Sequence, residues 1–335
     1  MIIVTGATGH IGNVLTRKLL SRGEEVRAII PANEDIIPLK GLDLEIIQAD
    51  IRDIDALNQA IKGASMVYHL AGVIAILPGR KELLTQVNVK GTQHVVEACL
   101  RNHVQRLVYT SSIHAIKEPP KGTCINESYP YDPTSVLGDY AKSKAQASLE
   151  VIKGVKQGLD AVIVCPTGVI GPGDYKISEM GQLFLDYLKK KIKVIVDGAY
   201  DFVDVRDVAE GLILAGLKGR TGEGYILSNE QISIPNLFKL LENISGIRAP
   251  RMKVPSWLAK AAGIVSTPYY ILSKRKPLVT AYSMDVLNSN SKVSSEKARR
   301  ELGFSTRSIR ESVSDTIAWL LEKTGKNIIL SEKIV

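Results

Sequence analysis

Short apolar runs alternate with longer amphipathic ones through the first half of the chain. The runs are rich in Val and Ile and are apolar on both faces, which is typical of parallel strands covered by helices. They lie at 1–4, 25–30, 44–49, 66–71, 106–111 and 160–166. Helical patterns separate them at 10–22, 54–62, 81–102 and 139–157. The alternation predicts an α/β fold with a doubly wound parallel sheet.

The pattern loosens after about residue 170. It predicts a strand at 193–196 and helices at 178–191, 205–218, 235–245, 256–263, 295–302 and 308–323. Pro268 and Pro277 are expected to break the stretch 260–277. The sequence has no long linker, internal repeat or low-complexity segment, so we expect the second half to pack onto the first.

Composition excludes several classes of protein. The chain of 335 residues has a net charge of +8, but its basic residues are spread out and do not alternate with aromatic ones, which argues against a nucleic-acid partner. Its three cysteines, Cys99, Cys124 and Cys165, suit a reducing compartment, and Cys99 and Cys165 lie in apolar runs typical of a core. The five histidines lack metal-ligand spacing, so no metal site is expected. With no leader pattern and no long apolar run, the expected location is the cytoplasm.

A glycine-rich turn joins the first predicted strand to the first predicted helix. In "VTGATGHIG", Gly6 permits the tight turn, Gly9 lets backbone approach a pyrophosphate, and Gly12 allows close helix packing. The N-terminus of the helix offers unpaired N–H groups to an anion. The turn therefore predicts a dinucleotide coenzyme, contacted by Gly6, Thr8, Gly9, His10, Ile11 and Gly12.

A tyrosine and a lysine lie one helical turn apart in "GDYAKSKAQAS". Residues four apart share a helix face, so Tyr140 and Lys144 can meet the same ligand. A cation ~4 Å from a phenol in a partly dry site lowers its pKa by roughly three units. The spacing thus predicts a tyrosine tuned as general acid/base, although such a pair alone is common on surfaces.

Two further motifs accompany this pair. "VYTSSIHA" ends the fifth predicted strand, and carboxyl ends of strands are where ligands bind in such sheets, which makes Thr110 and Ser112 candidates. "NVKGT" contains Asn88, which is either part of the same site or a helix cap. The conjunction of separate segments is more specific than any one of them.

Together these motifs resemble the extended short-chain dehydrogenase/reductase family over nearly the whole chain. "ADIRD" (49–53), "HLAG" (69–72), "CPTGVIGPGD" (165–174), "DFVDVRDVA" (201–209) and "KARRELGF" (297–304) are similar to further elements of that family. The resemblance implies a Rossmann domain with a smaller, interleaved C-terminal substrate-binding domain. The expected division is 1–170 and 193–229 for the dinucleotide-binding domain, and 171–192 and 230–335 for the substrate-binding part.

The resemblance also implies a role for each candidate residue. Ser112 and Tyr140 would hold a substrate carbonyl, with Tyr140 as proton donor. Lys144 would lower the pKa of the tyrosine and hold the nicotinamide ribose, and Asn88 would hold a water that relays protons. Further coenzyme contacts would come from Asp50, Ile51, Leu70, Ala71, Gly72, Thr110, Tyr140, Lys144, Pro166 and Val169.

The choice of coenzyme depends on the end of the second predicted strand. It reads Ile30-Pro31-Ala32-Asn33, without the acid that usually binds a ribose hydroxyl or the arginine that binds a 2′-phosphate. Asn33 can hydrogen-bond a hydroxyl. The expectation tilts toward NAD(H) and leaves NADP(H) open.

The branch of the family sets the expected chemistry. Ser112-Ile113-His114 lacks the Asp-Glu pair of sugar dehydratases, and "VCPTG" (164–168) resembles the dihydroflavonol reductase and hydroxysteroid dehydrogenase branch rather than the epimerases. The expected function is an NAD(P)(H)-dependent oxidoreductase acting on the ketone or aldehyde of a hydrophobic small molecule. A nucleotide-sugar 4-epimerase and a non-catalytic NAD(P)-sensing protein are the alternatives. His114 is expected to pack rather than to touch substrate.

The stretch 254–272 is apolar and aromatic. It suits the wall of a hydrophobic pocket, a plain core or an interface. A less favoured alternative is a membrane-surface contact through Trp257, Tyr269, Tyr270 and the Lys274-Arg275-Lys276 cluster. The resemblance implies a homodimer through 88–102 and 139–157.

Overall fold

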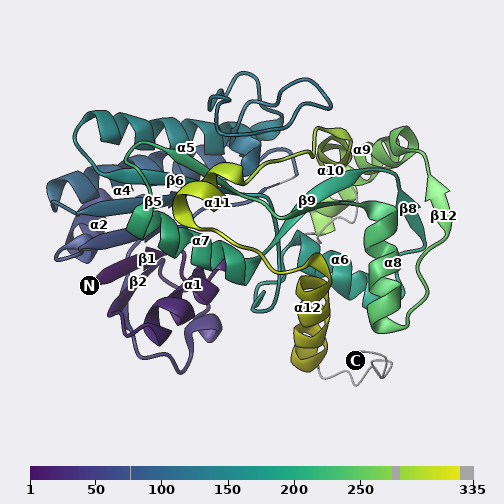
Figure 1. The fold of residues 1–335 in the computed structure, drawn as a ribbon, viewed down its shortest axis with the longest axis horizontal. Coiled ribbons are helices and arrows are strands. Elements are labelled where there is room, and N and C mark those ends of the chain that lie inside the picture. The colour runs from purple at the N-terminus through teal and green to yellow at the C-terminus, as the bar shows by residue number, and fades with distance from the viewer. Residues whose placement is uncertain (76, 274–279, 325–335) are drawn as a thin grey trace.

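A seven-stranded parallel sheet forms the centre of the computed structural model, which describes residues 1–75, 77–273 and 280–324 (Figure 1). The strand order is β10-β6-β5-β4-β1-β2-β3. The bounds are β1 Ile2–Thr5, β2 Val26–Ile30, β3 Glu45–Gln48, β4 Met66–His69, β5 Arg106–Thr110, β6 Ala161–Pro166 and β10 Gly224–Leu227. The six strands predicted from apolar runs and the doubly wound fold are confirmed, and β10 is an additional edge strand.

Helices cover both faces of this sheet, as the two-sided apolar runs require (Figure 1). One face carries α2 (Ile54–Ile61), α4 (Gly91–Arg101) and α5 (Gly138–Lys156). The other carries α1 (His10–Ser21), α7 (Val205–Lys218) and α11 (Glu296–Leu302). The helix predicted at 81–102 is divided into α3 (Lys81–Leu84), a π-helical stretch η2 (Thr85–Lys90) and α4.

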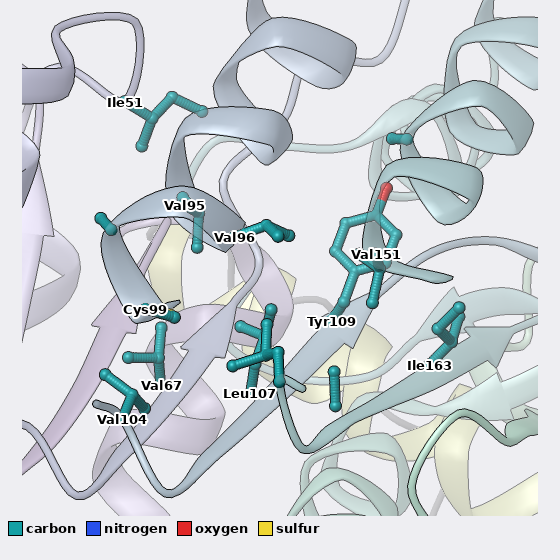
Figure 2. Close-up of a cluster of buried hydrophobic side chains, with 14 of the residues drawn as sticks. Ile51, Val67, Val95, Val96, Cys99, Val104, Leu107, Tyr109, Val151 and Ile163 are labelled. Atoms are coloured by element: carbon teal, nitrogen blue, oxygen red, sulfur yellow. The ribbon is translucent and has the colours of Figure 1, made fainter. Parts of the chain in front are cut away.

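Figure 2 shows the core beneath α4 and α5. Val95 and Cys99 of α4 and Val151 of α5 pack against Val67 of β4 and Leu107 of β5, and all five side chains are fully buried. Burying each such aliphatic side chain stabilises the fold by about 1.5–3 kcal/mol. Cys99 is a core residue as predicted, and so is Cys165; all three cysteines are free thiols.

The second part of the chain builds a separate core beside the carboxyl ends of the main strands. A three-stranded sheet contains β7 (Gly168–Ile170), β9 (Ala199–Asp204) and β11 (Glu230–Ser233), and β8 (Val194–Val196) pairs in parallel with β12 (Met252–Val254). Helices α6 (Glu179–Leu188), α8 (Ile234–Ser245) and α12 (Ile309–Thr324) surround these strands. Phe184, Leu237 and Val313 are fully buried between them.

Helix α9 (Ser256–Ser273) corrects one prediction, because Pro268 lies inside it and does not end it. A proline removes one helical hydrogen bond, and hydroxyl bonds from Ser266 and Thr267 to the Gly263 carbonyl support the turn before it. Helix α10 (Ala281–Asn288) was not predicted, although Thr280 and Ser283 form a capping box at its start. Pro277, Lys274-Arg275-Lys276 and the segment 325–335 lie outside the described residues.

The division into two domains stays a prediction, but some elements can be placed relative to it. Strand β8, which the predicted division assigns to the dinucleotide-binding domain, pairs with β12 of the predicted substrate-binding part. The core that contains α7 also includes residues of α11 and just after it, which the predicted division assigns to the substrate-binding part. They are Ala298, Leu302 and Phe304. Of the helices that the structure describes, none combines the length and apolar character needed to cross a bilayer. The described residues contain no group of three or more His, Cys, Asp or Glu side chains suited to a metal ion.

Candidate active site

The turn between β1 and α1 is tightly packed around two glycines. Gly6 has a φ of +71°, and a Cβ there would lie 2.6 Å from the Ala71 backbone nitrogen. A Cβ on Gly12 would lie 2.1 Å from the Gly6 carbonyl oxygen. Gly9 is the N-cap of α1 and supplies no side-chain cap, and the first turn holds no acidic residue. The first N–H groups of α1 are therefore suited to an anion.

The other predicted contact residues lie at the same edge of the sheet. Leu70, Ala71 and Gly72 follow β4, Thr110 ends β5, and Ser112 comes two residues later. Pro166 ends β6, and Val169 lies in β7. The sheet thus brings to its carboxyl edge residues that are far apart in the sequence, as the motif analysis required.

Helix α5 places Tyr140 beside Ser112. The helix begins at Gly138, whose φ is +85° and whose missing Cβ leaves room for the Tyr282 ring, since that atom would lie 2.6 Å from Tyr282 Cε2. Burial raises the pKa of Tyr140 to about 12, while a hydrogen bond with Ser112 acts in the opposite direction. The two hydroxyls are therefore close enough to grip one ligand atom.

Lys144 is buried one turn further along α5, with 6% of its surface exposed. Its Nζ donates to the Thr110 carbonyl oxygen at 2.8 Å and to the Tyr109 hydroxyl at 3.4 Å. Burial lowers the pKa of Lys144 to about 8. The predicted lowering of the Tyr140 pKa is wrong for the protein by itself, because burial of the phenol dominates and raises that pKa.

Asn88 lies inside the π-helical stretch η2 and does not cap a helix. Its Oδ1 accepts from the Val73 N–H at 2.8 Å, and its Nδ2 donates to the Val73 carbonyl at 3.0 Å and to Ser143 Oγ at 2.9 Å. A Cβ on Gly72 would lie 3.2 Å from Asn88 Oδ1 and 3.7 Å from Lys144 Nζ. Asn88 thus ties the loop after β4 to α5, next to the buried ammonium. π-helical turns of this kind are frequent at functional sites.

Glu34 was missed by the sequence analysis, which found no acid at the end of the second strand. Thr8 Oγ1 donates to Glu34 Oε1 at 2.8 Å, and Lys176 forms an ion pair with the same oxygen. Burial acts to raise the pKa of Glu34, but the hydrogen bonds from Lys176 and Thr8 lower it overall. Asn33, the residue singled out beforehand, is exposed in a left-handed turn with a φ of 63°. The available signal was an acid one residue beyond the stretch considered.

Three further residues predicted to contact the coenzyme have well-defined neighbours in the structure. Asp50 pairs with Arg52 and accepts from its backbone N–H at 2.9 Å, which leaves its carboxylate partly exposed. Ile51 packs against Gly91, where a Cβ would come within 2.5 Å of its side chain. His10 Nε2 lies 3.1 Å from the Pro172 carbonyl oxygen, so the glycine-rich turn contacts the segment that follows β7.

A large apolar cavity opens beside this edge of the sheet. Its volume is about 650 Å³, and side chains such as Met180, Phe202, Phe238, Leu258 and Met284 line it. A smaller cavity of about 90 Å³ is lined by Ile113 and Ala141, the neighbours of Ser112 and Tyr140. The smaller cavity therefore lies beside the segments that carry the paired hydroxyls, and the larger one lies in the second part of the chain.

His114, Tyr200 and Tyr282 line both cavities. His114 Nε2 lies 2.7 Å from the Tyr200 hydroxyl, and burial lowers the pKa of His114 to about 4. The Tyr282 hydroxyl is buried without a hydrogen-bond partner among the described residues. Sequence reasoning missed Tyr200 and Tyr282. His114 packs against both rings as expected, but it also faces the cavities.

Comparison with known proteins agrees with this geometry. The chain is 36% identical to sterol demethylase protein B of Methylococcus capsulatus over 96% of this chain and 98% of that protein. It is 33% identical to a putative dihydroflavonol 4-reductase of Synechocystis sp., over 94% and 93% of the two chains. The solved structure of gox2253 is 32% identical and superposes with a TM-score of 0.85 over 97% of this chain and 98% of that one. Residues 2–228 match the model of one family. The chain belongs to the NAD dependent epimerase/dehydratase family.

Proposed function

We propose that this protein is an NAD(P)(H)-dependent oxidoreductase that reduces the ketone or aldehyde of a hydrophobic molecule, or oxidises the corresponding alcohol. The observation that carries the proposal is the apolar cavity of about 650 Å³, which shares His114 and Tyr282 with the smaller cavity lined by the sequence neighbours of Ser112 and Tyr140. Two relatives bear names that refer to a sterol and to a dihydroflavonol, both of which are hydrophobic ring compounds.

The residues present fit a nicotinamide dinucleotide. The uncapped N-terminus of α1 suits its pyrophosphate, and the Glu34 carboxylate suits a ribose hydroxyl at the end of β2. Thr110 Oγ1 is buried without a hydrogen-bond partner among the described residues, at the end of β5 beside the Lys144 ammonium. Such a hydroxyl is available to a ligand. Gly6, Gly9, Gly12, Ala71, Gly72, Asp50, Ile51, Pro166 and Val169 would complete the contacts.

The chain's own residues then position the carbonyl and move the proton. The coenzyme, when bound, supplies the hydride that reduces the carbonyl carbon. Ser112 and Tyr140 hold the carbonyl oxygen with two hydroxyl hydrogen bonds, and Tyr140 transfers its proton to that oxygen. Lys144 provides positive charge that stabilises the phenolate left after this transfer, and the phenolate then regains a proton through the relay. Asn88 positions the loop after β4 and adjoins the proposed proton relay. Most of the acceleration would come from positioning and from preorganised hydrogen bonds.

The side chains that line the cavity and the two paired hydroxyls favour a reductase over the 4-epimerase and over the coenzyme sensor. A nucleotide-sugar 4-epimerase needs many polar partners for a sugar and a diphosphate, whereas Met, Phe, Leu, Ile, Val and Ala make up most of the lining of this cavity. A coenzyme sensor would have no use for hydroxyls of Ser112 and Tyr140 paired beside a buried lysine. The reductase therefore explains more of the site than either alternative.

Assembly and location stay proposals as well. We retain a homodimer through α4 and α5, whose outer surface includes the exposed Leu149. The three free cysteines suit a reducing compartment such as the cytoplasm.

The first test is a substrate panel with NADH and NADPH. We expect turnover of steroid or flavonoid ketones, or of long-chain aldehydes, and no conversion of UDP-sugars, because the cavity offers apolar walls. Coenzyme absorbance measures the hydride transfer. Conversion of a UDP-sugar to its 4-epimer without net coenzyme turnover would contradict the reductase, and inactivity with every compound despite tight coenzyme binding would favour the sensor.

A second test removes the proton donor. Tyr140→Phe should lower kcat by about 100-fold or more, because proton transfer to the carbonyl oxygen is lost. Coenzyme binding, followed by protein fluorescence, should change little. Tyr129→Phe is the matched control, since Tyr129 packs against the core away from the paired hydroxyls. An active Tyr140→Phe enzyme would refute the acid/base assignment.

The pH dependence of reduction should follow Lys144. Tyr140, with a pKa of about 12, and His114, with a pKa of about 4, each keep one protonation state between pH 6 and pH 9. Lys144 is charged below its pKa of about 8 and neutral above it. Initial rates should therefore give a kcat/KM for coenzyme that is level in the acidic part of this range and falls about tenfold per pH unit beyond the Lys144 pKa. A rise through that pKa would contradict a role for the ammonium.

The coenzyme preference should depend on Glu34. Its carboxylate can accept from a ribose 2′-hydroxyl and repels a 2′-phosphate, so NADH is expected to be preferred. Glu34→Gln should lower kcat/KM for NADH by about tenfold, which corresponds to about one hydrogen bond to a charged group, and should affect NADPH less. Asp35→Asn is the control on the neighbouring exposed acid. An unchanged ratio of the two coenzymes would exclude Glu34 from the ribose site.

A further inference from the structure

Helix α9 exposes an apolar stripe to solvent. The exposed fractions are 72% for Trp257, 57% for Ile264, 80% for Val265 and 84% for Leu272. Positions 257, 264, 265 and 272 share one face, because seven or eight residues span two helical turns. The single charged residue of this 18-residue helix, Lys260, is paired with Asp285.

The stripe borders the mouth of the large cavity. Leu258 and Ala262 of α9 and Lys193 and Val194 at the start of β8 line the cavity and are exposed, so they mark its opening. His114, Tyr200 and Tyr282 also line the smaller cavity beside Ile113 and Ala141, the sequence neighbours of the proposed catalytic hydroxyls. The opening beside α9 therefore belongs to a cavity that shares lining side chains with the one next to Ser112 and Tyr140.

The rim of this opening carries an excess of positive charge, although it also includes the exposed Glu179. Lys189, Lys190, Lys191 and Lys193 are exposed between α6 and β8. The pairing of Met252 with Val194 brings Arg251 beside Lys193. Figure 1 shows α9, β8 and β12 at the same end of the molecule. An apolar helix face with an exposed tryptophan and a basic border is complementary to an anionic lipid surface.

We propose that α9 docks on the surface of a bilayer that contains anionic phospholipid. Trp257, Val265 and Leu272 enter the boundary between headgroups and acyl chains, and the lysines between α6 and β8 contact the headgroups. Resting on the proposed function, this orientation lets a hydrophobic ketone pass from the bilayer into the cavity beside α9 without crossing water.

The test uses Trp257 as its own probe. The chain has two tryptophans, so Trp319→Phe leaves Trp257 alone. Phosphatidylcholine vesicles with about 30 mol% phosphatidylserine should shift its emission to the blue and carry the protein into the pellet. Pure phosphatidylcholine, or about 0.5 M salt, should weaken both effects. Sedimentation of the unsubstituted protein provides the same reading independently of the Trp319 change.

A double variant, Val265→Asp with Leu272→Asp, should reduce vesicle binding by at least about tenfold because it puts two carboxylates into the docking face. Leu217→Asp is the matched control, since Leu217 is 65% exposed on α7, remote from α9. Failure of the unsubstituted protein to bind, or equal binding by the double variant, would overturn the proposal. Light scattering that shows a dimer broken by the double variant, without vesicle binding, would assign the face to a second copy and overturn it as well.

Turnover of a short, water-soluble ketone separates this proposal from the proposed function. Neither Val265 nor Leu272 is among the residues that line the cavity, so the double variant should keep that turnover. Loss of vesicle binding with retained turnover supports the docking role. Absence of turnover in the unsubstituted protein would contradict the reductase and leave the vesicle result to decide the docking alone.

Discussion

The candidate active site depends on one buried charge. The Lys144 ammonium is almost fully removed from water, and a buried cation is costly unless its N–H groups find acceptors. It finds them in the Thr110 carbonyl and the Tyr109 hydroxyl, both at the end of β5. Since α5 also carries Tyr140 and β5 leads into Ser112, this contact fixes the two hydroxyls of the proposed mechanism relative to each other.

A continuous hydrogen-bond network links the elements around the Lys144 contact. The His69 ring bridges Thr5 and Thr92, with distances of 2.7 Å and 3.0 Å to their hydroxyl oxygens, and Thr92 donates to the Asn88 carbonyl at 2.6 Å. Asn88 then holds Val73 and Ser143. Because each member has a partner, the network can hold β1, β4, η2 and α5 in one arrangement. The cavity on the other side is apolar and contributes volume instead of directed contacts. The directed hydrogen bonds and the apolar volume thus lie in different parts of the molecule.

Local patterns in the sequence predicted the elements whose signals are local. Parallel strands such as β5 and β6 are buried on both faces, so their apolar runs are visible in the sequence. The glycine-rich turn and the Tyr140–Lys144 spacing are also local. Strand β11 has two exposed residues out of four, and α7 and β10 separate it in the sequence from its partner β9. No apolar run therefore marks β11 in the sequence. Tyr282 reaches Gly138 across a long sequence separation, and only the fold reveals that contact.

The four-residue spacing of Tyr140 and Lys144 did not predict the direction in which the pKa of Tyr140 is shifted. The four-residue interval correctly put the phenol and the ammonium on one helix face, but the sign of the shift depends on how dry the site is. The same dryness raises the pKa of Tyr140 to about 12 and lowers that of Lys144 to about 8. At neutral pH the phenol therefore holds its proton and the amine remains charged. This is the pair of states that donates a proton to a carbonyl, whereas alcohol oxidation must first form a phenolate in a site that disfavours it. For the proposed reaction these states suit reduction of a carbonyl, and oxidation would need further positive charge beside Tyr140.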